Sequence, residues 1–357
     1  MDRRSFLKVV GGVAGGYAAA AMVGCTPEPK SPKTNSGGNS PLPLRPLGKT
    51  GEKISIVGFP GLSLMRDEQD VCTKALHNAF DQGVNHFDVA PAYGKDGICE
   101  VRMGVGLVGI PRDKYFLSCK TKMRDQDGAR LELERSLKRL KTDHFDLYQL
   151  HHLRFPHEVK KALGPGGAME TILKAKQEGK VRYIGFSAHT TKAALEAMKG
   201  FRFDTVMFPI NFVEYYTMGF GKPVLKLAQK QGAAVLAIKP LSAGAWPTDL
   251  PRNQRSRPWW YRCTETQEEV NLAMRFTLSF KPVVNGIPPS WFDLTEKAIE
   301  AGRQFKPITR EETERLQTMA RDRLSVFKRE EDQVAFNRPC REPYPPNPHD
   351  CCPAAYA

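Results

Sequence analysis

Eight short runs rich in β-branched and aromatic residues recur along this 357-residue chain, separated by stretches with apolar residues at three- and four-residue spacing. The first pattern is typical of strands and the second of amphipathic helices. Strands that alternate with helices predict a parallel sheet with both faces covered. Eight such units over about 250 residues predict a (β/α)8 barrel. The runs span 53–59, 85–89, 114–120, 144–150, 181–187, 204–210, 233–239 and 282–286, and examples of the helical stretches span 70–83, 129–141, 168–179 and 191–200.

The alternative to a barrel is an open, doubly wound α/β sheet. That fold would place a G-x-G-x-x-G turn after the first strand, and no such turn follows residues 53–59. The chain from about residue 51 onward has a normal length for one α/β barrel. With 41% hydrophobic residues the protein can build a large core. We therefore expect a single barrel domain over residues 51–325.

The N-terminus has the features of a targeting segment. Two arginines at 3–4 precede an apolar, glycine-rich run over 9–23, which is short for a membrane span. The order Arg-Arg-Ser-Phe-Leu-Lys resembles the bacterial twin-arginine export signal, and Met-Val-Gly-Cys resembles a lipobox in which Cys25 is acylated. We expect a signal over 1–24 and a lipid-anchored protein in the bacterial cell envelope, facing the periplasm or the outside. A plain cleaved signal and an uncleaved anchor are the alternatives.

Proline-rich segments flank the expected barrel. Residues 25–50 hold six prolines among Ser, Gly and Asn, a composition that buries too little apolar surface to fold, so we expect a flexible tether. Residues 326–357 have the composition of a Cys- and Pro-rich tail. Its cysteines are compatible with a disulfide in an oxidising envelope or, with His349 nearby, with a metal, although no C-x-x-C spacing favours the metal. They are Cys340, Cys351 and Cys352.

The formal net charge of +14 restricts the partners that the chain would attract. A basic balance favours phosphates, acidic lipids or acidic sugars. The sequence contains no basic and aromatic module of the kind that binds nucleic acid, so we expect no nucleic-acid partner. Much of the charge is expected on an ordinary solvated surface.

Polar residues stand where several expected strands end. Catalytic residues of a (β/α)8 barrel come from the carboxyl ends of its strands. Asp88 and Tyr93 lie at and just beyond one strand, Lys120 ends the next, and His151 follows a third. Taken alone, each of these residues is compatible with an ordinary hydrogen-bonded polar side chain at a solvent-exposed strand end. Because they arrive from successive strands, together they indicate an active site.

The segments FDVAPAYG, YFLSCK, FDLYQLHH and GKVRYIGFSAH resemble, in order and spacing, the aldo-keto reductase family. The resemblance runs from about residue 53 to residue 302. It implies an (α/β)8 barrel that transfers hydride between NAD(P)H and a carbonyl without a metal. It also implies that the catalytic residues are Asp88, Tyr93, Lys120 and His151.

The physical chemistry of these four residues agrees with that role. A carbonyl that accepts hydride becomes an alkoxide and needs a proton, which Tyr93 would supply. A free phenol, with a pKa near 10, is a weak acid, and a neighbouring ammonium lowers the pKa of a phenol. Lys120 would be that ammonium and Asp88 its buried partner, while His151 would hydrogen-bond the carbonyl oxygen. The alternative is a plain buried ion pair beside a capped aromatic ring.

The resemblance also implies a dinucleotide site, with departures. Ser187 matches a residue that contacts the nicotinamide carboxamide, Asn211 sits where a second amide contact is usual, and residues 237–244 match a loop along the pyrophosphate. Lys239 falls near the place of a stacking aromatic, and prolines at 288–289 stand where hydroxyl or basic residues would hold the adenosine phosphate. We expect NADP or NAD, with the preference open. The expected cofactor-binding residues are Ser187, Asn211, Lys239, Pro240, Leu241 and Gly286.

A long segment over 246–265 carries Trp259, Trp260 and Tyr261 among several arginines. Such a segment would form either a lid that stacks a sugar-like or anionic substrate, or a loop packed on its own aromatic residues.

Two functions are compatible with these observations. The first is an exported oxidoreductase that acts on a small carbonyl or sugar-like substrate. It would fold and load its cofactor before export, and a second substrate or an unidentified redox partner would recycle the cofactor. The second is a catalytically quiet barrel that binds a ligand or partner.

Overall fold

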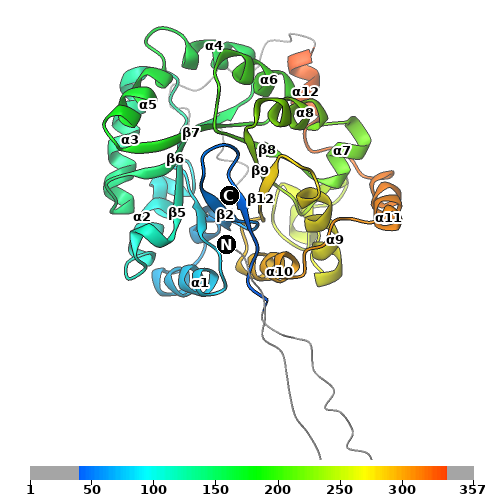
Figure 1. Cartoon of the computed structure of the whole chain (residues 1–357). Helices are drawn as coiled ribbons and strands as arrows, with labels where there is room; N and C mark the ends of the chain where they lie inside the picture. Colours follow the sequence, from blue (N-terminus) through cyan, green and yellow to red (C-terminus); the bar gives the residue numbers. More distant parts are fainter. Residues whose placement is uncertain (1–39, 336–357) are drawn as a thin grey trace, which may run out of the picture. The chain divides into compact units, whose positions relative to one another are not determined.

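Eight parallel strands close into a barrel at the centre of the protein (Figure 1). The computed structural model describes residues 40–335. The strands neighbour one another in chain order, and a bridge between Val57 and Gly286 joins the last strand to the segment before the first. The predicted barrel is therefore confirmed. Its strands are β3 (Phe59–Pro60), β4 (His86–Asp88), β5 (Phe116–Thr121), β6 (Phe145–Leu153), β7 (Val181–Ala188), β8 (Thr205–Pro209), β9 (Ala234–Ile238) and β12 (Val283–Ile287).

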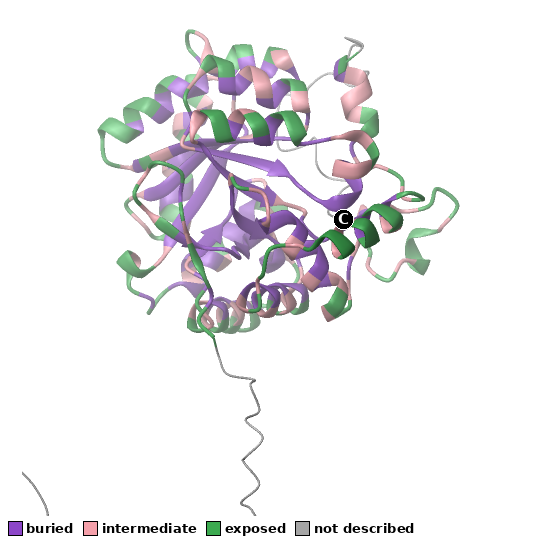
Figure 2. Cartoon of the chain, turned by 45° about the vertical axis from the view of Figure 1, so that its right-hand side comes forward, coloured by how far each residue is buried: buried purple, intermediate pink, exposed green. Residues whose placement is uncertain are grey.

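Helices surround the barrel, with buried residues toward the strands and exposed residues toward solvent (Figure 2). Local sequence signals start several of them. The Asp125 side chain accepts a hydrogen bond from the N–H of Gly128, and Thr266 and Glu269 form a capping box. The helices are α1 (Gln69–Asp81), α2 (Ile98–Gly106), α3 (Gln126–Leu140), α4 (Pro156–Leu163), α5 (Ala168–Gln177), α6 (Thr191–Gly200), α7 (Phe212–Met218), α8 (Lys222–Gln231), α9 (Gln267–Leu278), α10 (Phe292–Arg303), α11 (Arg310–Ala320) and α12 (Lys328–Ala335), with short 3-10 turns at Gly61–Met65, Lys95–Gly97, Arg112–Lys114 and Arg252–Gln254.

An antiparallel hairpin covers the amino-terminal end of the barrel. Its strands are β1 (Leu44–Pro46) and β2 (Lys53–Ser55), and Leu47 and Ile54 are fully buried in an apolar cluster with residues of the barrel strands. The prediction of one strand over 53–59 is wrong, because β2 pairs within the hairpin and the barrel strand begins only at Phe59. An unbroken apolar run gives no signal for where a chain leaves one sheet and enters another.

The predicted tether and tail are both wrong over the parts that the structure describes. Leu42, within the predicted tether, is buried, and β1 belongs to the hairpin. Phe327, within the predicted tail, is also buried, and its ring stacks on that of Phe220 at 4.9 Å between centroids. Single apolar residues between polar or proline-rich stretches therefore anchor both ends of the barrel domain. The predicted signal over 1–24 and Cys25, Cys340, Cys351 and Cys352 lie outside the described residues.

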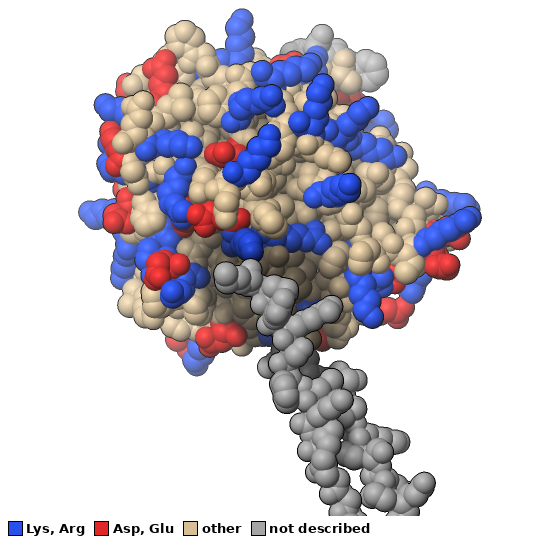
Figure 3. All heavy atoms as spheres, viewed as in Figure 1, with Lys and Arg blue, Asp and Glu red and all other residues tan. Residues whose placement is uncertain are grey.

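Basic side chains gather on the face that carries the hairpin (Figure 3). Lys49, in the hairpin loop, lies over Gly232. Figure 3 shows further Lys and Arg side chains over the region where α5, α6 and α8 lie in Figure 1. Cations near helix C-termini interact favourably with the helix dipole, so part of this charge stabilises the fold. The exposed basic residues at the C-terminal ends of these helices are Lys174, Lys176, Lys199, Arg202 and Lys230.

We expect Leu47→Ala to lower the free energy of unfolding by about 2–5 kcal/mol, because it opens a cavity beneath the hairpin. The matched control is Leu44→Ala, since Leu44 is 49% exposed in the same hairpin, and its cost should stay within about 0.5 kcal/mol. Urea unfolding followed by circular dichroism measures both. Equal effects of the two substitutions would show that the hairpin does not support the barrel.

Candidate active site

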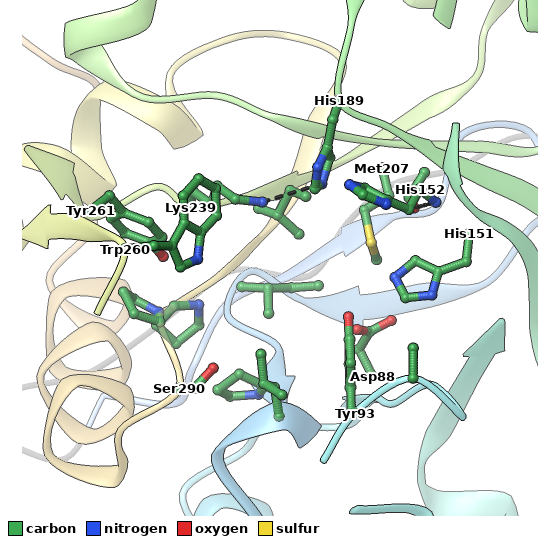
Figure 4. A pocket seen from close by; sticks show the side chains of 18 of the residues that line it. Asp88, Tyr93, His151, His152, His189, Met207, Lys239, Trp260, Tyr261 and Ser290 are labelled. Carbon is green, nitrogen blue, oxygen red and sulfur yellow. Dashed lines mark hydrogen bonds between the residues drawn. The ribbon is translucent and has the colours of Figure 1, made fainter. Parts of the chain in front are cut away.

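A pocket opens where the carboxyl ends of the barrel strands meet (Figure 4). The strand-end residues predicted from the sequence therefore do come together. Asp88 and Tyr93 come from β4 and its loop, His151 from β6, Ser187 from β7, and Lys239 from the end of β9. The other lining residues are Pro60, Leu62, Ala92, Lys122, His152, His189, Met207, Ile238, Trp259, Trp260, Tyr261, Ile287, Pro288, Pro289 and Ser290.

The ammonium group of Lys120 lies at the base of this pocket and joins its catalytic candidates. Its Nζ donates to Asp88 Oδ2 at 2.5 Å, to the Val89 carbonyl at 3.2 Å and to Tyr93 Oη at 3.1 Å. The Lys120 side chain is fully buried and Asp88 is nearly so. Burial raises the pKa of the Asp88 carboxyl, and the Lys120 ammonium opposes that rise. Asp88 and the Val89 carbonyl thus hold one buried cation against the Tyr93 hydroxyl.

Strand register explains why this cation reaches Asp88. β4 pairs in parallel with β5, and Asp88 is the partner of Ser118. Lys120 is two residues further along β5, so its side chain points to the same face one layer nearer the pocket. Below it, Ser118 Oγ lies 2.8 Å from His86 Nε2, and burial lowers the pKa of His86 to about 4. The layer beneath Lys120 therefore contains a neutral imidazole rather than a second cation.

His151 stands beside Tyr93 at the end of β6. The two rings meet edge to face with centroids 5.6 Å apart, and both point into the pocket (Figure 4). A buried ion pair holds this strand end, because Arg124 Nη2 donates to the His151 carbonyl at 2.8 Å and to Glu158 at 3.2 Å. Burial acts to raise the pKa of Glu158, but Arg124 and backbone N–H groups together lower it. The Arg124–Glu158 pair therefore holds the backbone of His151 in place.

A second polar group forms the opposite wall. Lys239 Nζ donates to His189 Nε2 at 3.3 Å, and the rings of His189 and His152 meet with centroids 4.1 Å apart. Burial first, and then the Lys239 charge, lower the pKa of His189 well below its usual value, so this imidazole is neutral. Lys239 and His152 both have positive φ, 57° and 61°, which is uncommon outside glycine and recurs at functional sites.

The tryptophan-rich segment lies at the mouth of the pocket. β10 (Ser242–Ala245) pairs with β11 (Tyr261–Cys263), which brings Trp259, Trp260 and Tyr261 onto the pocket wall. The Trp246 indole donates to the Trp259 carbonyl at 2.8 Å. A pair of hydrogen bonds from Arg257 to Asp293, at 3.1 and 2.6 Å, ties the segment to α10. The expectation of aromatic side chains facing a ligand is consistent with this placement.

The predicted cofactor residues divide into two groups. Ser187 and Lys239 line the pocket, and the Ser187 hydroxyl accepts a hydrogen bond from the His152 N–H at 2.7 Å. The other four do not line the pocket. Asn211 is buried as the N-cap of α7, with its Nδ2 unpaired within residues 40–335, and Gly286 lies inside β12, where its N–H donates to the Ile56 carbonyl. Pro240 and Leu241 directly follow Lys239 in the chain and are buried.

Sequence reasoning missed Lys122 as a pocket residue. The spacing Lys-Thr-Lys over 120–122 was a signal, because side chains two residues apart on a strand share a face. Met207 also lines the pocket without having been predicted. The part of the chain that the structure describes holds no group of three or more His, Cys, Asp or Glu side chains arranged to hold a metal ion.

Comparison with known proteins places residues 65–320 within a family model, that of the aldo/keto reductase family. L-galactose dehydrogenase of Arabidopsis thaliana is 32% identical over an alignment that covers 41% of this chain and 48% of that protein, so the match spans about half of its length. An NAD/NADP-dependent indole-3-acetaldehyde reductase of Schizosaccharomyces pombe is 30% identical, covering 55% of this chain and 69% of the relative. A 6-dehydroglucose reductase of Novosphingobium aromaticivorans is also 30% identical, covering 57% and 71%.

The fold is shared with solved structures. The holo form of the aldo-keto reductase AKR11C1 from Bacillus halodurans superposes with a TM-score of 0.63 at 22% identity, covering 79% of this chain and 98% of that one. The inhibitor complex of the thermostable aldo-keto reductase Tm1743 gives a TM-score of 0.60 at 20% identity, with 78% and 100% covered. At these identities the likeness concerns the fold.

We expect Asp88 and Lys120 to be strongly coupled in stability. Asp88→Leu or Lys120→Met alone should cost about 3–5 kcal/mol of unfolding free energy, since each leaves an uncompensated buried charge. The double variant should recover most of that loss. The control is the exposed pair of Lys328 and Asp332, 2.9 Å apart, whose removal should cost less than about 1 kcal/mol. Additive single effects in a denaturant-based double-mutant cycle would contradict the coupling.

Proposed function

The chain belongs to the aldo/keto reductase family, and from that premise we propose that it is an NAD(P)-dependent oxidoreductase. The reaction is hydride transfer between a nicotinamide cofactor and an aldehyde or ketone, or the reverse reaction on an alcohol. The observation that carries the proposal is the buried Lys120 ammonium bound to both Asp88 and Tyr93. A structural ion pair has no need of a phenol within hydrogen-bond distance at the base of a pocket.

Tyr93 is the proton donor in this mechanism. When hydride reaches the carbonyl carbon, the bonding pair of the C=O moves to oxygen, and the Tyr93 hydroxyl supplies a proton to that oxygen. The phenolate left behind lies 3.1 Å from the Lys120 ammonium, which stabilises it. Asp88 keeps Lys120 in place, and His151 beside Tyr93 donates a hydrogen bond to the carbonyl oxygen as negative charge develops.

The residues on the far wall fit a nicotinamide cofactor, which when bound supplies or accepts the hydride. Ser187 offers a hydroxyl for the carboxamide. Asn211 does not line the pocket, but its buried Nδ2, unpaired within residues 40–335, is a donor that a polar ligand atom would satisfy. Lys239 supplies positive charge on the same wall. The prolines at 288 and 289 carry neither hydroxyl nor charge, so these two residues offer no contact that would favour NADP over NAD.

The substrate in this proposal is a small carbonyl compound or a sugar. Trp260 and Tyr261 present aromatic faces to the pocket, and such faces pack against sugar rings. Two of the relatives are named for sugar substrates, L-galactose dehydrogenase and 6-dehydroglucose reductase. A barrel that only binds a ligand is the second candidate, favoured by the two prolines at the adenosine end of the pocket.

We expect Tyr93→Phe to lower kcat for aldehyde reduction by about 100- to 10,000-fold, the usual contribution of a general acid. Binding of NADPH or NADH, measured by calorimetry, should stay close to that of the wild type. The control is Tyr183→Phe, because Tyr183 contacts the hairpin at the opposite end of the barrel. Undiminished reduction by Tyr93→Phe would refute the mechanism. A protein that neither binds dinucleotide nor reduces any aldehyde would instead be the binding-only barrel.

We further propose that the protein is exported by the twin-arginine route and anchored through an acylated Cys25. The support is the sequence of residues 1–25 together with the basic side chains on the face that carries the hairpin. Exposed lysines such as Lys176 and Lys230 on that face would attract anionic headgroups. Within the described residues, none of the helices combines the length and apolar character needed to cross a bilayer. A redox partner or second substrate would recycle the cofactor outside the cytoplasm.

We expect Cys25→Ala to shift the protein from the membrane fraction to the soluble fraction of a bacterial host. Each buried CH2 of an acyl chain contributes about 0.8 kcal/mol to membrane binding, so loss of the lipid removes the anchor. Fractionation, with mass spectrometry of the mature N-terminus, measures the shift. Cys340→Ala is the control and should remain with the membrane. An unmodified Cys25 in membrane-bound protein would exclude the lipid anchor.

A further inference from the structure

The amino-terminal end of the barrel carries a cluster of exposed cations, which we call the basic face. Helices of a (β/α)8 barrel run antiparallel to its strands, so their C-terminal ends lie at this end, beside the hairpin. Figure 3 shows Lys and Arg side chains gathered over the region where α5, α6 and α8 lie in Figure 1. The basic face consists of the exposed residues Lys49, Lys174, Lys176, Lys199, Arg202 and Lys230.

Contacts between the hairpin and the helix ends make these cations one continuous surface. Gln231, at the end of α8, donates from its side chain to the carbonyl of Met198, near the end of α6, at 2.9 Å. The Lys49 side chain, in the hairpin loop, covers Gly232, which directly follows α8. The hairpin loop, α6 and α8 therefore present their cations side by side.

The acidic side chains at these helix ends leave most of the positive charge uncompensated. Glu178, directly after α5, lies 2.8 Å from Arg130. Asp204, in the loop after α6, accepts a hydrogen bond from the Ile184 N–H at 2.9 Å and lies 4.0 Å from Lys176 at the end of α5. Within residues 40–335, the other cations of the basic face have no carboxylate oxygen as near as 4.0 Å.

Helix stability explains only part of this charge. A cation in the last turn of a helix interacts favourably with the helix dipole, and the lysines at the ends of α5, α6 and α8 have that position. Lys49 lies in the hairpin loop and Arg202 lies beyond the end of α6, so neither is part of a helix. Like charges gathered on one surface repel one another, and an anionic partner relieves that repulsion.

Lipid headgroups match this surface better than nucleic acid does. Within residues 40–335 the exposed large apolar side chains are leucines and valines, with no aromatic ring on which a base could stack. Leu44, exposed in the same hairpin, offers an apolar contact that the headgroup region of a bilayer can use. Clusters of about four to eight Lys and Arg beside a membrane attract anionic lipids.

We infer that the basic face docks on an anionic phospholipid bilayer and holds the barrel with its pocket directed away from the membrane. The orientation follows from the fold, because the pocket lies at the carboxyl ends of the strands and the basic face at the opposite end of the barrel. A small ligand then reaches the pocket from the aqueous side. The inference concerns the folded barrel, so it needs neither reductase chemistry nor an acylated Cys25.

The test measures sedimentation of the protein with vesicles. The protein is the full-length Cys25→Ala chain, in which no acyl chain contributes, and the vesicles contain phosphatidylcholine alone or in equal parts with phosphatidylglycerol. Each Lys or Arg near an anionic bilayer strengthens binding roughly fivefold, so we expect the mixed vesicles to be preferred by about tenfold or more. Added salt should weaken the preference, because it shortens the Debye length. Equal binding to the two kinds of vesicle would overturn the inference.

Two matched double variants locate the contact, because α6 and α8 each carry an exposed lysine near both ends. Lys199→Gln/Lys230→Gln removes two charges from the basic face, and the preference for mixed vesicles should fall by about tenfold or more. Lys192→Gln/Lys222→Gln removes the same charge from the opposite ends of the same helices and should change the preference less than about twofold, since distant charges are screened. Equal losses in both variants would indicate attraction by net charge alone and would overturn the docking surface.

Hydrogen exchange followed by mass spectrometry tests the orientation without any substitution in the barrel. With mixed vesicles, amides of the hairpin loop and of the C-terminal ends of α6 and α8 should gain protection. The segment over 246–265, at the pocket mouth, should exchange as it does in the free protein. Protection of the pocket mouth in place of the hairpin would reverse the orientation and overturn the inference.

A duplex DNA of mixed sequence tests the competing partner at the same salt and the same phosphate concentration. Weaker binding of the DNA than of the mixed vesicles supports a lipid partner. Tighter binding of the DNA that is lost in Lys199→Gln/Lys230→Gln would assign the basic face to nucleic acid instead, and the lipid assignment would fail. Neither result depends on whether the protein reduces a carbonyl.

Discussion

The buried ammonium of Lys120 is the group around which this barrel is arranged. A cation in a protein interior is costly unless acceptors surround it, and here Asp88, the Val89 carbonyl and Tyr93 take its three hydrogen bonds. The parallel register of β4 and β5 supplies two of these acceptors, and the loop after β4 supplies the phenol. The requirement to satisfy one cation therefore positions the proposed acid.

Part of the pocket is built by segments that lie outside the repeating strand–helix units. The segment over 246–265 places its aromatic residues on the mouth, fixed by Arg257 and Asp293. Phe327, from near the end of the described chain, packs its ring 5.7 Å from that of His189 and 6.1 Å from that of Trp260. Loops can vary without disturbing the strand scaffold, so they set the shape and charge that a ligand meets.

Much of the fold and half of the site could be predicted from the sequence. Each barrel strand overlaps a predicted run, and the structure brings all four catalytic candidates together. The wrong boundaries at Leu42 and Phe327 share one physical cause. Each is a single apolar residue in a polar context, and its burial depends on a partner far along the chain, such as Gly302 for Leu42 and Phe220 for Phe327. The composition of the neighbouring residues does not indicate partners so far along the chain.

By itself the sequence determined the barrel and the residue types at its strand ends. The spacing of apolar residues and the order of the strands can both be read along the chain, and together they fix which side chains face the same edge of the sheet. Only the tertiary structure decided which polar residues share a pocket. Asn211 and Gly286 were both predicted to bind the cofactor. In the structure the Asn211 side chain caps α7, and the Gly286 N–H donates to the Ile56 carbonyl where the barrel closes. Lys122, unremarked in the sequence, lines the pocket because strand tilt and closure turn it inward. Charge compensation acts through space, and the distances that govern it exist only in the folded chain.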